Sequence, residues 1–185
     1  MSQVAISGNA SGTGTLTIAA PNTNSNYTLT LPTQTGTVMA NGPAFSAYGN
    51  ASQTIANNTT TKVQINTERF DTASCFDSTT NYRFTPTVAG YYQINGNVSF
   101  GNGVNNTGVY LLLYKNGTTI STASGNASTN TYASPTISTL VQMNGSTDYL
   151  ELYVLQVTGS SIPINATVIA TGDGINFSGS MVRGA

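Results

Sequence analysis

The stretch of residues 84–100 constrains the fold of this chain more than any other part of the sequence. From Gly90 onward, the apolar residues Tyr92 and Ile94 alternate with polar residues such as Gln93. Alternation at a period of two places apolar side chains on one face of a β-strand and polar side chains on the other. The stretch therefore predicts a central strand with one face in the core.

Shorter runs of the same kind recur after residue 42, separated by turn-forming residues. The chain has ten Tyr and six Phe, whereas charged residues make up only 6% of it, against roughly 25% in an average domain. Aromatic and threonine-rich segments of this kind favour β-structure. The sequence predicts strands at 44–48, 61–66, 69–71, 82–85, 91–100, 108–115, 118–122, 134–143, 149–157, 166–170 and 176–182.

The spacing of these strands indicates an all-β fold, either a sandwich or a jelly roll. No segment combines apolar residues at the helical period with a helix cap and a helix stop, so we expect essentially no helix. The pairs Asn116-Gly117 and Asn144-Gly145 are each flanked by predicted strands and predict hairpin turns.

Two of the predicted strands, 109–114 and 149–155, are apolar on both faces apart from Glu151. A strand of a sandwich normally exposes one of its faces to water. A second apolar face therefore predicts a contact between subunits. The candidate contact residues on these strands are Tyr110, Leu112, Tyr114 and Tyr153.

Residues 1–42 are predicted to form an N-terminal β-arm for anchoring or assembly, followed by one domain at 43–185. The arm has short alternating runs at 12–19, 26–32 and 36–40. A few short strands are only marginally stable by themselves. We therefore expect the arm to be ordered by packing on another chain or on the body, the alternative being a floppy tail.

The arm resembles a segment that recurs in phage tail-fibre and other virion proteins. The match runs from Gly12 to Val38. It follows the order Gly-Thr-Leu-Thr-Ile, Ala-Pro-Asn-Thr, Thr-Leu-Thr-Leu-Pro and Gly-Thr-Val. The resemblance implies a role in a virus particle.

The charge pattern excludes several classes of partner. The net charge is −1 and the five basic residues are scattered, so no basic patch exists for nucleic acid or for an anionic membrane. The longest apolar run, 109–114, is too short to span a bilayer. Residues 1–7 lack the basic and apolar segments of a secretory signal, so we expect none.

The sequence offers little for catalysis or cofactor binding. The chain has no histidine, which removes Ser-His-Asp and Cys-His nucleophiles and most zinc sites. The single cysteine, Cys75, is expected to be a small buried residue. Glu68 with Asp71 or Asp77 could form a carboxylate pair like that of glycosidases. Their turn-rich surroundings favour solvated loop carboxylates instead.

Calcium is the remaining cation to consider, because it takes oxygen ligands. Asp77 and Asp173 are conceivable ligands, but neither belongs to a recognisable acidic calcium loop. We therefore expect no catalytic residues, no cofactor and no metal site, and so no enzymatic activity.

Four motifs after residue 42 resemble those of C1q/TNF-type jelly-roll domains. The first is an aromatic residue, five residues, Gly-x-Tyr and a hydrophobic residue. The others are a Lys-Asn-Gly turn, an Asp that leads into a strand, and a closing Phe-Ser-Gly strand. The residues that carry the structural motif are Phe84, Gly90, Tyr92, Ile94, Asn116, Gly117, Phe177 and Gly179.

The chain departs from that family at Ile94 and Gly96, where the family usually has aromatic residues. The resemblance covers roughly residues 43–182. It implies a ten-stranded jelly roll that assembles as a homotrimer, and a structural role for the motif residues. The subunit contacts proposed above would then be trimer contacts.

Taken together, these features lead to the hypothesis of a bacteriophage virion structural protein. A trimeric capsid decoration (cement) protein is favoured, because an arm of 42 residues is too short for both an adaptor and a long shaft. Its partners would be two further copies and other virion proteins, most of all the major capsid protein. The alternative is a tail-fibre or head-fibre tip that binds host surface glycans. A secreted cytokine-like ligand is disfavoured, since collagen-type repeats are absent.

Overall fold

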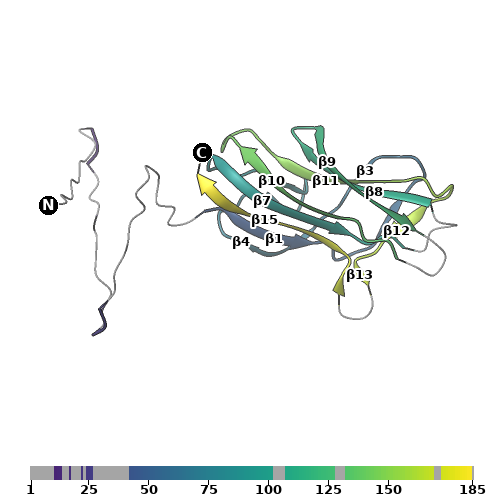
Figure 1. Cartoon of the computed structure of the whole chain (residues 1–185), viewed down its shortest axis with the longest axis horizontal. Coiled ribbons are helices and arrows are strands. Elements are labelled where there is room, and N and C mark those ends of the chain that lie inside the picture. The colour runs from purple at the N-terminus through teal and green to yellow at the C-terminus, as the bar shows by residue number, and fades with distance from the viewer. Residues whose placement is uncertain are drawn as a thin grey trace. The chain divides into compact units, whose positions relative to one another are not determined.

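The computed structural model describes residues 11–13, 17, 22, 24–26, 42–101, 107–127, 132–168 and 172–184. The chain divides into two units, Met1–Gly36 and Thr37–Ala185, and the fold below is that of the second (Figure 1). The runs predicted for the arm lie almost entirely outside the described residues, so the arm and its boundary at residue 42 remain predictions.

The described part of the body contains strands and turns and no helix, which confirms the predicted all-β class. No helix that could cross a membrane occurs among the described residues. The strands are β1 (Ala44–Tyr48), β2 (Gln53–Ile55), β3 (Thr61–Lys62), β4 (Thr67–Asp71), β5 (Phe76–Asp77), β6 (Arg83–Phe84), β7 (Gly90–Val98), β8 (Thr107–Lys115), β9 (Thr118–Ala127), β10 (Thr136–Met143), β11 (Leu150–Gln156), β12 (Ile162–Ile164), β13 (Thr167–Val168), β14 (Gly172–Asp173) and β15 (Ile175–Gly184).

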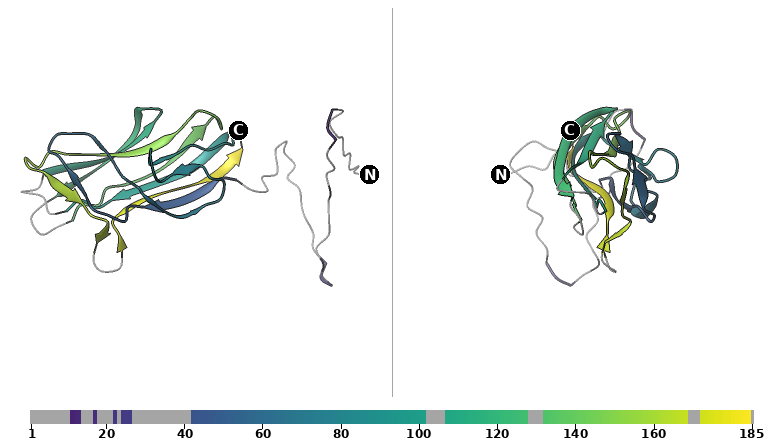
Figure 2. Two further views of the ribbon diagram at one scale, coloured as in Figure 1. Left: turned by 180° about the vertical axis from the view of Figure 1, so that it is seen from behind. Right: turned by 90° about the vertical axis from the view of Figure 1, so that its right-hand side faces the viewer.

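Eleven of these strands form a sandwich of two antiparallel sheets (Figures 1 and 2), while β2 pairs with β12 and β13 with β14. The five-stranded sheet has the order β10-β7-β15-β1-β4. The six-stranded sheet has the order β5-β6-β11-β8-β9, and β3 also pairs with β11. Strands that follow each other in sequence, such as β7 and β8 or β10 and β11, belong to different sheets. This crossing between the sheets is the arrangement of a jelly roll.

The core between the sheets is built around stacked aromatic rings. Phe45 from β1 lies 5.0 Å from Phe76 and 4.4 Å from Phe84, measured between ring centroids, and contacts Phe177 edge-on at 5.0 Å. Tyr92 packs against Phe84 at 5.5 Å. Such close aromatic pairs stabilise the core beyond the burial of their area.

The hydroxyl of Tyr92 is satisfied inside this core, because it donates to the carbonyl oxygen of Val88 at 2.7 Å. Burial raises the pKa of Tyr92 to about 12, so the phenol stays neutral at physiological pH. In β7, Tyr92 and Ile94 are buried while Tyr91 and Asn95 are exposed. The predicted alternation of the central strand is therefore confirmed.

Every predicted strand overlaps a strand of the structure, but the predicted count of ten is not confirmed. The structure describes fifteen strands. The sequence reading missed β2, β5, β12 and β14, which have only two or three residues each. Runs so short contain too few alternations to be distinguished from loops.

The two Asn-Gly pairs have different roles. Asn116 and Gly117 join β8 to β9 in a hairpin, with φ of 52° and 79°, as predicted. The hairpin predicted at Asn144-Gly145 is wrong, because β10 pairs with β7 whereas β11 pairs with β8. This loop instead carries the chain from one sheet to the other. The side-chain oxygen of Asn144 organises it by accepting hydrogen bonds from the amides of residues 146–148.

Gly145 is required in this loop for two separate reasons. Its φ is +70°, and a Cβ at this position would lie only 2.2 Å from the backbone nitrogen of Ala89. We expect Gly145→Ala to lower the free energy of unfolding by about 3 kcal/mol or more, since it combines backbone strain with a collision against backbone. Urea unfolding followed by circular dichroism measures this.

Gly159 provides the matched control, because its φ is +88° but a Cβ there would meet nothing within 4 Å. Gly159→Ala should therefore cost only the strain of the backbone conformation, about 1 kcal/mol. Equal losses in the two variants would mean that the contact with Ala89 is unimportant.

Candidate functional site

The motif residues of the sequence lie in the interior or in turns, and none of them forms a surface site. Phe84, Tyr92, Ile94 and Phe177 are fully buried. A Cβ at Gly179 would lie 2.6 Å from Ile94 Cδ1 and 2.9 Å from Phe45 Cε1, so the glycine leaves room for the core side chains of the neighbouring strands β7 and β1. Each of these residues has a structural explanation.

Gly90 has a similar role at the end of the five-stranded sheet. A Cβ at this position would lie 2.5 Å from the carbonyl oxygen of Arg183. Gly90 pairs with Gly184 at the point where β15 ends. The glycine at the start of the central strand thus permits a close approach of two backbones.

The Lys-Asn-Gly turn and the Asp that precedes β11 form one polar network. Asp148 lies 2.8 Å from Lys115 Nζ and accepts a hydrogen bond from Asn116 Nδ2 at 2.7 Å. It also accepts from the amide of Asn144, at 3.0 Å. The ammonium of Lys115 and then the amide of Asn116 hold the pKa of Asp148 below its ordinary value. Two motifs that are separate in the sequence therefore tie together one end of the sandwich.

We expect Asp148→Asn to lower the free energy of unfolding at pH 7 by about 2 kcal/mol, because the variant loses charge-assisted hydrogen bonds. The folded-state pKa is depressed, so the ionised carboxylate stabilises the protein above the unfolded value of about 3.9. This stabilisation is lost as the pH falls through the folded-state pKa. The difference between wild type and variant in urea unfolding should thus shrink in acid. A difference that does not change with pH would contradict this account.

The acidic residues considered as catalytic groups or as calcium ligands accept hydrogen bonds from nearby residues. Asp77 accepts hydrogen bonds from the amides of Thr79, Thr80 and Asn81 and from two side chains of the same loop. The amides of Thr80 and Thr79 hold its pKa far below the ordinary value. The acceptor positions of both carboxylate oxygens are thereby used within the loop.

The neighbouring carboxylates are engaged in the same way. Glu68 accepts from the hydroxyl of Ser78 at 2.6 Å, and Asp71 accepts from the amide of Phe76 at 2.7 Å. Within the described residues, no group of three or more His, Cys, Asp or Glu could hold a metal ion. The side chain of Asp173, the other calcium candidate, lies outside what the structure describes.

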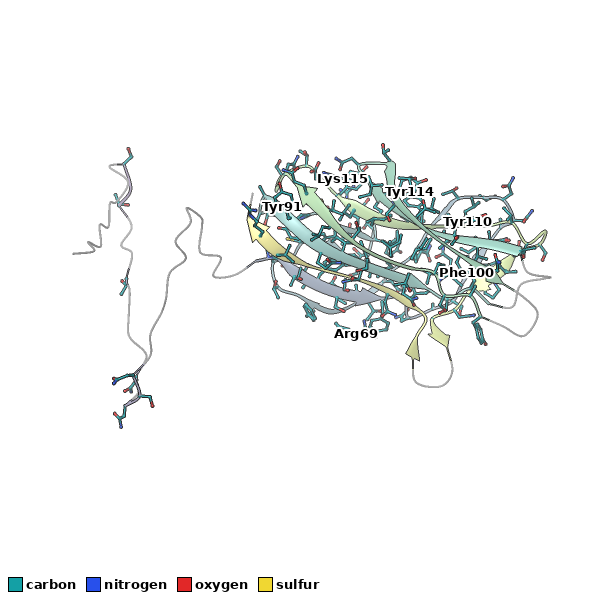
Figure 3. All side chains as sticks on the ribbon, viewed as in Figure 1. Arg69, Tyr91, Phe100, Tyr110, Tyr114 and Lys115 are labelled. Atoms are coloured by element: carbon teal, nitrogen blue, oxygen red, sulfur yellow. The ribbon has the colours of Figure 1, made fainter. Side chains whose placement is uncertain are left out.

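The four candidate trimer contacts, Tyr110, Leu112, Tyr114 and Tyr153, lie on the outward face of β8 and β11 together with Leu155. We call these five residues the tyrosine face; Figure 3 labels Tyr110 and Tyr114. All of them are half-buried within a single chain. The rings of Tyr114 and Tyr153 lie 4.3 Å apart, measured between centroids. The structure therefore brings these residues together, and Tyr114 and Tyr153 partly cover each other. Their role as trimer contacts remains a prediction.

An ion pair lies at the border of the tyrosine face. Lys62 Nζ of β3 is 2.6 Å from Glu151 Oε1, and Glu151 is only 4% exposed. The hydroxyl of Tyr153 donates to the other carboxylate oxygen at 3.3 Å. The buried carboxylate is thus compensated inside the chain, and the face as a whole is neutral.

The outward face of the five-stranded sheet, which we call the five-stranded face, is a second extended surface. Three of its five strands, β7, β10 and β1, carry no charged residue. Its polar side chains bond to one another: Gln93 donates to Ser138 at 3.0 Å, and Ser138 donates to Asn95 at 2.9 Å. These three side chains therefore meet part of their hydrogen-bonding capacity within the sheet.

Large apolar side chains lie exposed around these polar residues. Leu140 on β10 is 62% exposed, and Phe70 on β4 is 51% exposed. Tyr91 and Val182 lie at the end of the sheet where β15 finishes. The sequence reading did not identify this face. The available signal was a break in the alternation, since Leu140 and Tyr91 are each followed by a second apolar residue.

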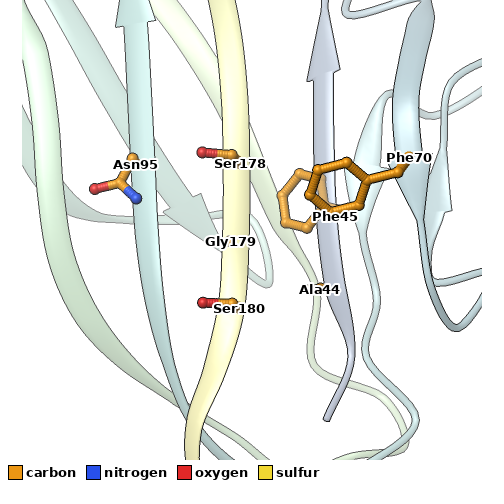
Figure 4. Close-up of a pocket in the computed structure, with 7 residues that line it drawn as sticks. All are labelled: Ala44, Phe45, Phe70, Asn95, Ser178, Gly179 and Ser180. Atoms are coloured by element: carbon orange, nitrogen blue, oxygen red, sulfur yellow. The ribbon is translucent and has the colours of Figure 1, made fainter. Parts of the chain in front are cut away.

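A shallow depression of 190 Å³ lies on the same face beside Phe70 (Figure 4). The hydroxyls of Ser178 and Ser180 and the amide of Asn95 line it. No charged side chain lines it. Its position gives the five-stranded face a hollow next to an exposed aromatic ring.

Comparisons with known proteins connect this fold to others. No family model matches the chain, and no curated protein matches its sequence. Among solved structures, the globular domain of zebrafish complement 1qA is 15% identical, with a TM-score of 0.52, over 78% of this chain and 100% of that chain. Eiger TNF from S. frugiperda is 8% identical, with a TM-score of 0.57, over 78% and 93%.

A third solved structure comes from a virus particle. PRD1 vertex protein P5 is 18% identical, with a TM-score of 0.54, and the match covers 77% of this chain and 96% of that chain. Likenesses at these identities establish the fold. The body of this chain therefore has the jelly-roll fold of C1q and TNF-like domains, as the motifs in its sequence imply.

Proposed function

We propose that this chain is a structural protein of a bacteriophage particle and that it decorates the surface of the shell as a homotrimer. The observation that carries the proposal is the fold, because phage PRD1 uses the same fold in its vertex protein P5. The resemblance of residues 12–38 to a segment of virion proteins supports the same conclusion independently.

The five-stranded face suits contacts between copies of this chain. A closed ring of three subunits needs two different, complementary patches on each subunit. The two edge strands of this sheet supply them: Leu140 is exposed on β10 and Phe70 on β4. Three of the polar side chains between them, Gln93, Ser138 and Asn95, are bonded to one another, so burying these three leaves fewer groups unsatisfied.

The tyrosine face is the other candidate for the trimer contact, as the sequence predicts. Its residues Tyr110, Leu112, Tyr114 and Tyr153 are already half-buried in one chain. Burial of exposed apolar area drives association, and Leu140 and Phe70 have more of it left to bury. We therefore place the trimer contact on the five-stranded face.

A decoration protein and a fibre tip differ in the number of copies in each particle. Quantitative mass spectrometry of purified particles of the virus that encodes this chain measures the ratio to the major capsid protein. Decoration predicts a copy number comparable with that of the capsid protein. A few copies per particle would support the glycan-binding fibre tip instead, and absence from the particle would contradict both functions.

Neither function requires catalysis. The carboxylates that could have formed an acid–base pair, Glu68, Asp71 and Asp77, bind donors of their own loops. The roles that we propose for this chain are those of a structural and binding protein.

A further inference from the structure

We propose that the tyrosine face is a binding surface for a neutral glycan. The proposal rests on the proposed trimer only in that a trimer contact on the five-stranded face leaves the tyrosine face free. It holds for a decoration protein as well as for a fibre tip, because either would present this face to the surroundings.

Aromatic side chains supply the apolar part of the surface. Tyr110 and Tyr114 are four residues apart on β8, so they lie roughly 13 Å apart along the strand. Tyr153 packs beside Tyr114. The face of an aromatic ring carries negative charge density and attracts the positively polarised C–H groups of a sugar ring.

A row of hydroxyl groups runs alongside these rings on the edge strand β9. Thr119 is paired with Tyr114, Thr122 with Leu112, and Ser124 with Tyr110. Paired residues of neighbouring strands share one face of a sheet, so the three hydroxyl groups lie on the tyrosine face. All three of these residues are exposed.

These hydroxyl groups are free to bind a ligand. Within the part of the chain that the structure describes, the side chains of Thr119, Thr122 and Ser124 make no hydrogen bond. The tyrosine face therefore presents unused donors and acceptors beside aromatic rings.

The charges of this region indicate that the ligand is neutral. Lys62 and Glu151 compensate each other at 2.6 Å, and Arg83 lies 4.7 Å from the ring centroid of Tyr149. A cluster of free cations would favour an anionic polymer, and none is present on the described strands of this face. Uncharged sugars combine apolar C–H faces with many hydroxyl groups, which matches this surface.

The test uses the full-length protein and a panel of neutral oligosaccharides, namely cellohexaose, maltohexaose and chitohexaose, with hyaluronan as the anionic comparison. Isothermal titration calorimetry measures binding. We expect at least one neutral oligosaccharide to bind, and Tyr110→Ser and Tyr114→Ser each to weaken it roughly tenfold. Thr122→Val, which removes a hydroxyl while keeping the shape, should also weaken it. Tyr132→Ser changes an exposed tyrosine that belongs to none of the strands β8, β9 and β11 and should leave binding unchanged.

Three results would overturn the proposal. The first is that no neutral oligosaccharide binds, or that only hyaluronan does. The second is that binding is equal in wild type and in the three variants of the face. The third is that Tyr114→Ser turns the trimer into monomers, as seen by light scattering on the same samples. That result would assign the face to the subunit contact and would contradict the proposed trimer geometry, whereas the first two would leave that geometry untouched.

Discussion

Replacing Leu140 by aspartate is expected to convert the proposed trimer into monomers. Leu140 is the most exposed large apolar residue of the described chain, at 62%. Its burial in a contact would contribute about 2 kcal/mol, and an aspartate would have to bury an unpaired carboxylate in the same place. Because a ring contains three equivalent contacts, the assembly constant should fall by on the order of 10⁴-fold.

Size-exclusion chromatography with light scattering measures this change, since one chain has a mass of 19.1 kDa and the trimer three times that mass. Ile120→Asp is the matched control, because Ile120 is also a large exposed aliphatic residue, at 44%, but lies on β9 of the other sheet. We expect the Ile120→Asp variant to remain a trimer. Dissociation of the control together with a stable Leu140→Asp trimer would move the contact to the six-stranded sheet.

Phe45→Ala should cause the largest loss of folding stability of any single change in the core. Phe45 is 1% exposed and contacts the rings of Phe76, Phe84 and Phe177 at centroid distances of 4.4–5.0 Å. Removing a buried phenylalanine costs about 3–5 kcal/mol. Since whole domains are stable by only about 5–15 kcal/mol, the variant should be close to unfolding at physiological temperature.

Urea unfolding at a fixed protein concentration measures the loss, because assembly couples stability to concentration. Tyr132→Ala removes an aromatic ring that is 47% exposed and should change the free energy of unfolding by about 0.5 kcal/mol or less. A loss for Phe45→Ala as small as that for Tyr132→Ala would mean that the aromatic cluster does not hold the two sheets together.

The sequence predicted the strands well because each long strand carries its own pattern. The alternation of Tyr92 and Ile94 with polar residues needs no knowledge of the rest of the chain, and β7 follows it. The Asn116-Gly117 hairpin is equally local, since both residues adopt positive φ. Such features depend on a few neighbouring residues, which is why they can be read from the sequence.

Pairing between distant strands could not be read in this way. Asn144-Gly145 has the composition of a hairpin turn, but the strands on either side belong to different sheets. Gly145 lies against the backbone of Ala89, a long-range contact that no local pattern reveals. The network of Asp148 with Lys115 and Asn116 likewise joins residues more than thirty positions apart.

The candidate surfaces were predicted only in part. An apolar residue at an outward position is visible in the sequence, which is how Tyr110, Tyr114 and Tyr153 became candidate contacts; that they are neighbours on one face is seen only in the structure. The extent to which the chain covers this face depends on Lys62. Its ammonium donates to Glu151, which lies 89 positions later in the sequence. The exposure of Leu140 likewise depends on distant strands, because the order of strands in the sheet places β10 at an edge.

Electron cryomicroscopy of the virus particles tests the central proposal most directly. The account predicts density for three jelly-roll bodies around local three-fold axes over the whole shell, with the residues before Pro43 in contact with the capsid protein. Density confined to the tail or to a single vertex, or a shell that carries no such trimers, would contradict it.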